Sequence, residues 1–229
     1  MFKSRVFSVE AVVNLILETY KGRGDSKLSL AIPGGRSPGP ILSELSKRMS
    51  PEDKKRLSLL WVDERLVPQG DTDRNDASTL KSWEEGGALP GNVLPMPTGP
   101  DLNHEESIAN YESSLMEACE NGIIDVCLIG IGEDGHFASL FPNHPLLKVT
   151  KRVAIIEDSP KQPPLRMTLS LPQIKTSRLN IVLCFGSEKG NVFRKSQLGA
   201  EKSLPVSLLN PENTIWFLDG DAIKASQEG

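Results

Sequence analysis

The 229-residue sequence lacks several features that would place it in a membrane or an oxidising compartment. No apolar run approaches the roughly 18 to 20 residues that span a bilayer, and the N-terminal residues MFKSRVFSVEAV have no long apolar stretch typical of a secretory signal. The three cysteines, Cys119, Cys127 and Cys184, cannot all pair and show no metal-ligand spacing. These absences predict a cytoplasmic protein with no disulfide framework, no metal and no membrane partner.

An excess of positive charge is also lacking. The chain has 26 Lys and Arg against 30 Asp and Glu, a net charge of −4, which gives no general attraction to nucleic acid. If the substrate is anionic, individual Arg and Lys residues must attract it. Hydrophobic residues make up 38% of the chain and charged residues 24%, which is typical of a soluble globular protein with a substantial core.

Apolar runs of strand length alternate with apolar residues at helical spacing. The predicted strands are residues 28–32, 57–62, a run that starts at Ile124, 179–185 and 214–218, with shorter strands at 153–156 and 167–171. Ser37 is expected to cap the second helix, with Pro38 at its first position. Residues 86–103 hold many Gly and Pro and predict an irregular connection. Strands alternating with helices predict a mostly parallel sheet covered on both faces, the α/β class.

Four polar motifs each follow a predicted strand. They are GGRS at 34–37, DER at 63–65, GEDGH at 132–136 and GSEK at 186–189. The carboxyl ends of parallel strands meet at one edge of the sheet, and open α/β sheets bind ligands in the crevice there. We therefore expect the four motifs to form one site.

His136 is the strongest catalytic candidate, because histidine is the side chain best matched to proton transfer near neutral pH. The alternative is a histidine held by a hydrogen bond in the core. Asp134 is placed to orient the imidazole or to bind substrate hydroxyls. No serine or cysteine nucleophile is evident near His136 and the G-x-S-x-G pattern is absent, which favours activation of a water molecule.

Three groups of residues are candidates for binding an anion. Residues 34–37 precede a helix N-terminus, which favours anions, although an ordinary turn would need the same glycines. Arg36 favours the anion, since a cation beside that helix end is unfavourable without one. Lys189 presents the same case in its own helix, against the alternative of a solvated surface lysine. Arg65 suits bidentate phosphate recognition, or else pairs with one of the two carboxylates before it.

Residues 130–135 also satisfy the dinucleotide pattern G-x-G-x-x-G. That fingerprint needs a full helix after the glycines, and Pro142-Asn143-His144-Pro145 would stop one almost at once. The fingerprint also leaves His136 unexplained. We therefore expect no dinucleotide at this turn.

The sequence resembles the 6-phosphogluconolactonase family over nearly its whole length. The resemblance is carried by AIPGGRSPGPIL, WVDERLVPQGDTDRNDA, IGIGEDGHFASLFP, SPKQPPLRMTLSLPQI and FGSEKGNVF. The related glucosamine-6-phosphate deaminases carry an aromatic residue where Arg65 stands, and after DGH they read on toward Asn-Glu-Pro rather than toward SLFP.

The resemblance implies a single domain over residues 1–229 with a Rossmann-like three-layer α/β/α sandwich of the NagB/RpiA/CoA transferase-like type. It implies hydrolysis of 6-phospho-D-glucono-1,5-lactone to 6-phosphogluconate, with no cofactor and no metal. The expected partner is a small phosphosugar lactone, and the expected state is a monomer or weak homodimer. The alternatives are a glucosamine-6-phosphate isomerase/deaminase and a phosphosugar-binding regulator without turnover.

The resemblance also implies roles for individual residues. His136 would be the general base, supported by Asp134, and the substrate-binding residues would be Gly34, Gly35, Arg36, Ser37, Asp63, Arg65, Asn75, Arg166 and Lys189. Asn75 and Arg166 are carried by the resemblance alone. Three residues depart from the family pattern: Phe137 stands where threonine is usual, and Arg36 and Arg74 replace small hydroxyl residues. Phe137 would line the pocket or face the core, and the two arginines would add phosphate contacts or fill a role met elsewhere.

Overall fold

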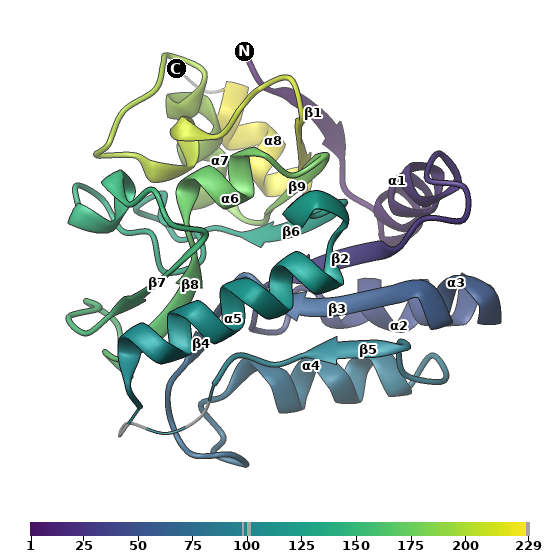
Figure 1. Cartoon of the computed structure of the whole chain (residues 1–229). Helices are drawn as coiled ribbons and strands as arrows, with labels where there is room; N and C mark the ends of the chain where they lie inside the picture. Colours follow the sequence, from purple (N-terminus) through teal and green to yellow (C-terminus); the bar gives the residue numbers. More distant parts are fainter. Residues whose placement is uncertain (98, 100–101, 228–229) are drawn as a thin grey trace.

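A seven-stranded sheet forms the centre of the molecule. The computed structural model describes residues 1–97, 99 and 102–227, and within them the strands of this sheet run in the order β1-β10-β9-β6-β2-β3-β5, all parallel (Figure 1). They are β1 (Lys3–Val6), β2 (Leu28–Ile32), β3 (Leu57–Trp61), β5 (Asn92–Leu94), β6 (Val126–Gly130), β9 (Leu179–Cys184) and β10 (Thr214–Leu218). The expected parallel α/β sheet is confirmed.

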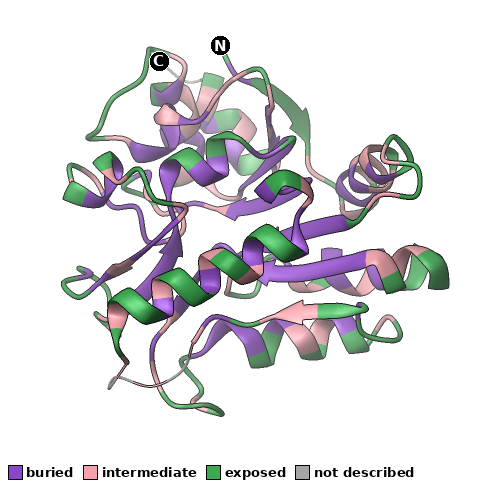
Figure 2. Cartoon of the chain, in the orientation of Figure 1, coloured by how far each residue is buried: buried purple, intermediate pink, exposed green. Residues whose placement is uncertain are grey.

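Helices cover both faces of this sheet. One face packs against α1 (Val9–Lys21), α2 (Gly39–Arg48) and α4 (Asn75–Glu84), and the other against α5 (His104–Ala118), α6 (Leu171–Lys175), α7 (Ser187–Ser196) and α8 (Gly220–Gln227) (Figure 1). Because successive strand side chains point to opposite faces, Leu59 of β3 joins the first core and Leu60 the second. The central strands are therefore buried on both sides, while the outer side of α5 is exposed (Figure 2).

A small antiparallel sheet, β4 (Asp63–Arg65), β8 (Arg166–Leu169) and β7 (Val153–Ile156), lies beside the main one. The short helix α3 (Pro51–Arg56) precedes β3, and 3₁₀ turns lie at Glu120–Gly122, Pro145–Lys148 and Pro205–Leu208. Strand β3 ends at Trp61, one residue before the predicted end of the strand 57–62. The DER motif is itself a strand, β4, of the second sheet. None of the described helices combines the length and apolar character needed to cross a bilayer.

Several local predictions differ from the structure. Ser37 does not cap α2, which begins at Gly39 after Pro38 with no side-chain cap. The predicted strand 167–171 ends at Leu169, because Ser170 caps α6 by accepting a hydrogen bond from the Gln173 N–H. The segment 86–103 contains β5, while its residues 98, 100 and 101 lie outside the described part.

The strand order creates a crevice at the centre of the sheet. Strands β2 and β6 are neighbours, but the chain leaves β2 toward β3 on one side and leaves β6 toward β9 on the other. Such a switch in direction opens a space at the carboxyl ends of the two strands, where ligands bind in open α/β folds.

Candidate active site

A cavity of about 270 Å³ lies at this edge of the sheet. Its lining comes from the loops after β2 and β6, from β4 and β8, and from the first turns of α4 and α7. Nine of the predicted site residues line it: Gly34, Gly35, Ser37, Asp63, Arg65, Asn75, His136, Arg166 and Lys189. The structure thus brings residues from all four motifs into one space.

Arg36 does not join them. It is exposed and lines a second, larger cavity of about 920 Å³ between α1, α2 and α4. The two cavities share Gly35, whose φ of +85° favours glycine. The larger cavity is lined by exposed side chains of both charges and holds no histidine. We therefore place the candidate active site in the smaller cavity, whose lining does not include Arg36.

A tight turn after β6 presents His136. The Gly132 N–H donates to the His136 carbonyl at 2.8 Å, and the Gly135 N–H donates to the Gly132 carbonyl at 3.0 Å. A Cβ atom on Gly132 would lie 2.1 Å from Cε1 of the His136 ring. The imidazole therefore packs directly on the backbone of residue 132, which only glycine permits. No helix begins between this turn and Pro145. A dinucleotide fingerprint needs a helix directly after its glycines, so the absence of one here agrees with the expectation that no dinucleotide binds.

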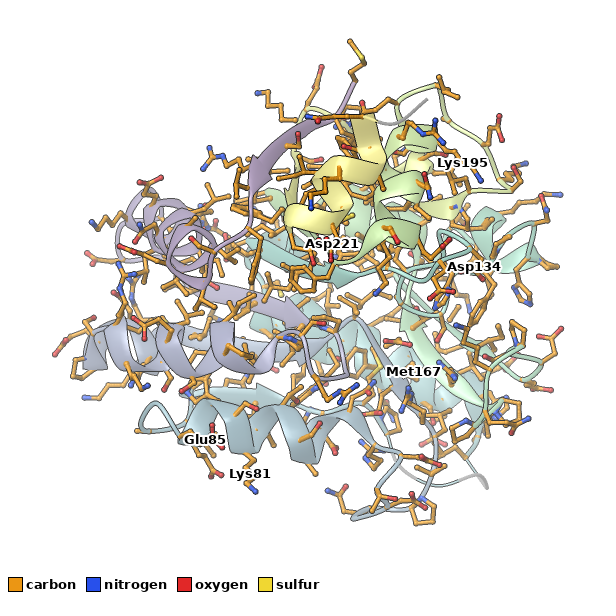
Figure 3. The ribbon with its side chains drawn as sticks, turned by 180° about the vertical axis from the view of Figure 1, so that it is seen from behind. Lys81, Glu85, Asp134, Met167, Lys195 and Asp221 are labelled. Atoms are coloured by element: carbon orange, nitrogen blue, oxygen red, sulfur yellow. The ribbon has the colours of Figure 1, made fainter. Side chains whose placement is uncertain are left out.

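Asp134 holds the imidazole from the solvent side. Its carboxylate contacts Nδ1 of His136 and accepts from the His136 backbone N–H at 3.2 Å; Figure 3 shows Asp134 on the loop after β6, on the same side of the molecule as Met167 of β8. A carboxylate can only accept here, so Nδ1 carries the proton and Nε2 keeps its lone pair. The His136 side chain is 15% exposed, and its ring lies 4.8 Å from that of Phe141, centroid to centroid.

The pKa of each partner fits this arrangement. Burial lowers the pKa of His136, an effect that the Asp134 carboxylate opposes and Lys161 reinforces. For Asp134, burial acts upward but the hydrogen bond and charge of His136 outweigh it, so its pKa is lowered. At neutral pH the pair is a carboxylate beside a neutral imidazole, which is the protonation state of a general base.

Two arginines face each other across the small sheet. Arg65 of β4 and Arg166 of β8 are direct cross-strand partners, and both line the cavity with Lys189. Like charges directly opposite destabilise a strand pair. Nη1 of Arg65 donates to the Asp73 carbonyl at 2.5 Å, whereas its buried Nε has no partner among the described residues. The arrangement favours a bound anion.

Arg166 is held in place by backbone carbonyls. Its Nε donates to Pro163 at 2.9 Å and its Nη2 to Lys161 at 2.8 Å. Nη1 lies 3.9 Å from Oδ2 of Asp63, which also accepts from Ser139 Oγ at 2.7 Å. Asp63 therefore pairs with Arg166, and the alternative in which Arg65 is neutralised by Asp63 does not apply.

Glu64 supports the site from behind, and sequence reasoning missed this role. Its buried carboxylate accepts from the backbone N–H groups of Arg65 at 2.8 Å, Asn75 at 2.8 Å and Asp76 at 3.0 Å, and burial raises its pKa. It thereby ties β4 to the first turn of α4. Asn75 in turn donates from Nδ2 to the Asp63 carbonyl at 3.0 Å.

Two departures from the family pattern prove to be structural. Arg74 is fully buried, with Nη2 donating to Asp76 at 2.6 Å and to the Met96 carbonyl at 3.1 Å. The option that Arg74 adds a phosphate contact is therefore wrong. Phe137 is fully buried in the core that covers the second face of the sheet, so it faces the core and not the cavity. Across the described part of the chain, no three His, Cys, Asp or Glu side chains are grouped as metal ligands.

Comparison with known proteins places this geometry in a family. The family described as "Glucosamine-6-phosphate isomerases/6-phosphogluconolactonase" matches residues 7–216. A 6-phosphogluconolactonase of Streptomyces coelicolor is 34% identical over 228 residues, covering 92% of this chain and 86% of that protein. The crystal structure of a 6-phosphogluconolactonase from Thermotoga maritima shares the fold, with a TM-score of 0.83 at 24% identity over 96% of this chain and 100% of that one.

The fold is also that of a monomeric glucosamine-6-phosphate deaminase, which matches with a TM-score of 0.76 at 16% identity over 98% of this chain and 100% of that one. Architecture alone therefore does not separate the two activities. The side chains in the cavity must do so.

Proposed function

This chain belongs to the glucosamine-6-phosphate isomerase/6-phosphogluconolactonase family, and from that membership we propose that it hydrolyses 6-phospho-D-glucono-1,5-lactone to 6-phosphogluconate, the lactonase step of the oxidative pentose phosphate pathway. One observation carries the proposal. A neutral imidazole shares a cavity with three cations, Arg65, Arg166 and Lys189. The cations can bind the phosphate of the substrate, and the imidazole can activate a water molecule that attacks its carbonyl carbon.

His136 activates the attacking water. Nε2 takes a proton from the water as its oxygen attacks C1, and the resulting imidazolium then gives a proton to the ring oxygen as the C1–O bond breaks. Asp134 stabilises the imidazolium through Nδ1. A positioned base of this kind contributes roughly 10² to 10⁴-fold, and backbone N–H groups of the glycine-rich turns hold the developing oxyanion.

The cations fix the lactone for this attack. Arg65 and Arg166 approach the phosphate from the small sheet and Lys189 from the first turn of α7. Binding the phosphate at one end of the substrate places the lactone carbonyl at the other end near His136. The binding energy is thereby used to orient the reacting groups. Asp63 and Asn75 contact substrate hydroxyls, and Gly34, Gly35 and Ser37 shape the wall of the cavity.

The setting that we propose for this reaction is a single domain over residues 1–229, without cofactor, acting in the cytoplasm as a monomer or weak homodimer. The three cysteines are buried and free, which supports a reducing compartment. The net charge of −4 supports a small anionic substrate bound by local cations, with no nucleic-acid partner.

Freshly generated 6-phosphogluconolactone tests the proposal. We expect the protein to accelerate its hydrolysis well above the spontaneous rate, and to act far more slowly on unphosphorylated glucono-1,5-lactone. His136→Ala should lower kcat by roughly 10² to 10⁴-fold with little change in KM.

The same assay separates the alternatives. Release of ammonia from glucosamine 6-phosphate would identify a deaminase. Binding of 6-phosphogluconate without any acceleration of lactone hydrolysis would identify a regulator. Full activity in His136→Ala would show that the assigned base is wrong.

A further inference from the structure

Asp219 lies outside the cavity lining, yet it connects to the turn that carries one of the three cations. We propose that Asp219 is a positioning residue, which places Lys189 against the phosphate of the substrate by fixing the start of α7. The inference rests on the proposed function, because it assigns a support to the same phosphate site.

The carboxylate of Asp219 joins two helix starts. Asp219 directly follows β10, and its backbone N–H donates to the Cys184 carbonyl at the end of β9 at 3.2 Å. Oδ1 accepts from the Gly186 N–H at 3.0 Å and from the Ala222 N–H at 2.9 Å, and Oδ2 lies 3.1 Å from the same Gly186 nitrogen. One side chain therefore caps α8 and grips the residue before α7.

Gly186 is the joint between β9 and α7. Its φ of +86° and ψ of 162° are open to glycine and strained for other residues. No side chain caps α7 at this position, and the first helical bond runs from the Gly190 N–H to the Gly186 carbonyl at 3.1 Å. Since glycine has the most backbone freedom of any residue, the carboxylate of Asp219 is what selects this conformation.

The packing of α7 on α8 carries the constraint to Lys189. A Cβ atom on Gly190 would lie 2.4 Å from the Ala222 carbonyl oxygen, so the two helices touch backbone to backbone one residue after Lys189. Asp219 holds both helix starts and the helices touch at Gly190, so the first turn of α7 is constrained at two points. Lys189 lies in that turn and lines the cavity.

Asp219 and Lys189 both influence the thiol of Cys184, the last residue of β9. The pKa of the buried Cys184 thiol is raised by burial, pushed further up by Asp219 and opposed by Lys189. Both charges therefore act on the same sulfur atom, with opposite sign. Oδ1 accepts from both Gly186 and Ala222, so an asparagine oxygen at this position would keep those two bonds. The asparagine amide nitrogen would replace Oδ2, which lies 3.1 Å from the Gly186 nitrogen, and two donors would then face each other.

The test compares Asp219→Ala with Asp219→Asn in the full chain. Asp219→Ala should raise KM for 6-phosphogluconolactone about tenfold, the loss of one charge-assisted hydrogen bond to the phosphate, while kcat stays near the wild-type value. Its kcat/KM for unphosphorylated glucono-1,5-lactone should not change. Asp219→Asn, which keeps the Oδ1 bonds but loses the Oδ2 contact, should restore KM in part. The matched control is Asp221→Ala, two residues along in the exposed first turn of α8 (Figure 3), which should behave as wild type.

A second variant keeps the test informative if Asp219→Ala does not fold. Gly186→Ala introduces no contact within 4 Å but strains the same φ, and it should raise KM in the same selective way with Asp219 intact. Equal losses on both lactones, or an unchanged KM in both variants, would overturn the inference. A wild-type protein that does not accelerate lactone hydrolysis would instead refute the proposed function.

Discussion

Adding a methyl group at residue 132, in the variant Gly132→Ala, gives the sharpest test of the site. In Gly132→Ala the new Cβ would lie 2.1 Å from Cε1 and 2.2 Å from Nδ1 of His136. Carbon atoms in contact need about 3.5 Å, so the ring must move by about 1.4 Å, which is 3.5 minus 2.1. The backbone of residue 132 is not in the left-handed region, so alanine itself adds no strain there.

A shift of this size should be costly for catalysis and nearly silent for binding. Misplacing a reacting group by about 1 Å can cost roughly 10²-fold, so we expect kcat to fall about a hundredfold. KM should stay near the wild-type value, because the cations that hold the phosphate come from other strands. Initial rates on freshly generated lactone over a range of concentrations separate the two constants.

Gly130→Ala is the matched control for an added methyl group in the same segment. Its Cβ would lie 3.8 Å from Cβ of Pro33, an ordinary contact. Because Gly130 also lines the cavity, the comparison uses kcat, which should remain near wild type. Melting temperatures of both variants show whether folding is intact. If Gly132→Ala folds and keeps its kcat, the position of the His136 ring does not matter, and the assignment of His136 as base fails.

Four further predictions address charge. Because burial holds the pKa of His136 below its ordinary value of about 6.5, kcat/KM should fall only as pH drops below that value. Asp134→Asn should move the inflection lower still, since the carboxylate acts to raise that pKa; a pH–rate profile with its inflection above 6.5 would contradict this. Arg65→Ala should raise KM at least about tenfold for the phosphorylated lactone, and steady-state kinetics that leave KM unchanged would count against the anion site. Arg74→Ala should lower the free energy of unfolding by about 3–5 kcal/mol, because it leaves the buried Asp76 without its partner; a urea titration that matches wild type would argue against a structural role.

The sequence carried enough information to predict the class of fold and most of the site. Buried strands are continuous apolar runs because helices cover both of their faces, so the runs 28–32, 179–185 and 214–218 could be identified directly, the second one residue too long. The motifs after four of the strands share one edge because the sheet is parallel. His136, Arg65 and Lys189 followed from that single inference.

Other features depend on contacts that a pattern does not encode. Nothing local tells that β4 pairs with β8, so the cross-strand meeting of Arg65 and Arg166 needed the tertiary structure. Arg36 is exposed and lines another cavity, whereas Arg74 is buried against Asp76. This difference depends on the direction of each side chain, which the sequence pattern does not give. Strand β1 was missed because all of its residues are exposed, which removes the apolar signal.

The cross-strand pair of Arg65 and Arg166, both of which line the cavity, makes the proposed site sensitive to other anions in solution. Inorganic phosphate and the reaction product both present the dianionic group that relieves the repulsion between the two side chains. If the phosphate site is as proposed, we expect each of them to compete with the lactone for it. Turnover will slow as product accumulates, and a phosphate buffer will mask affinity that a zwitterionic buffer reveals.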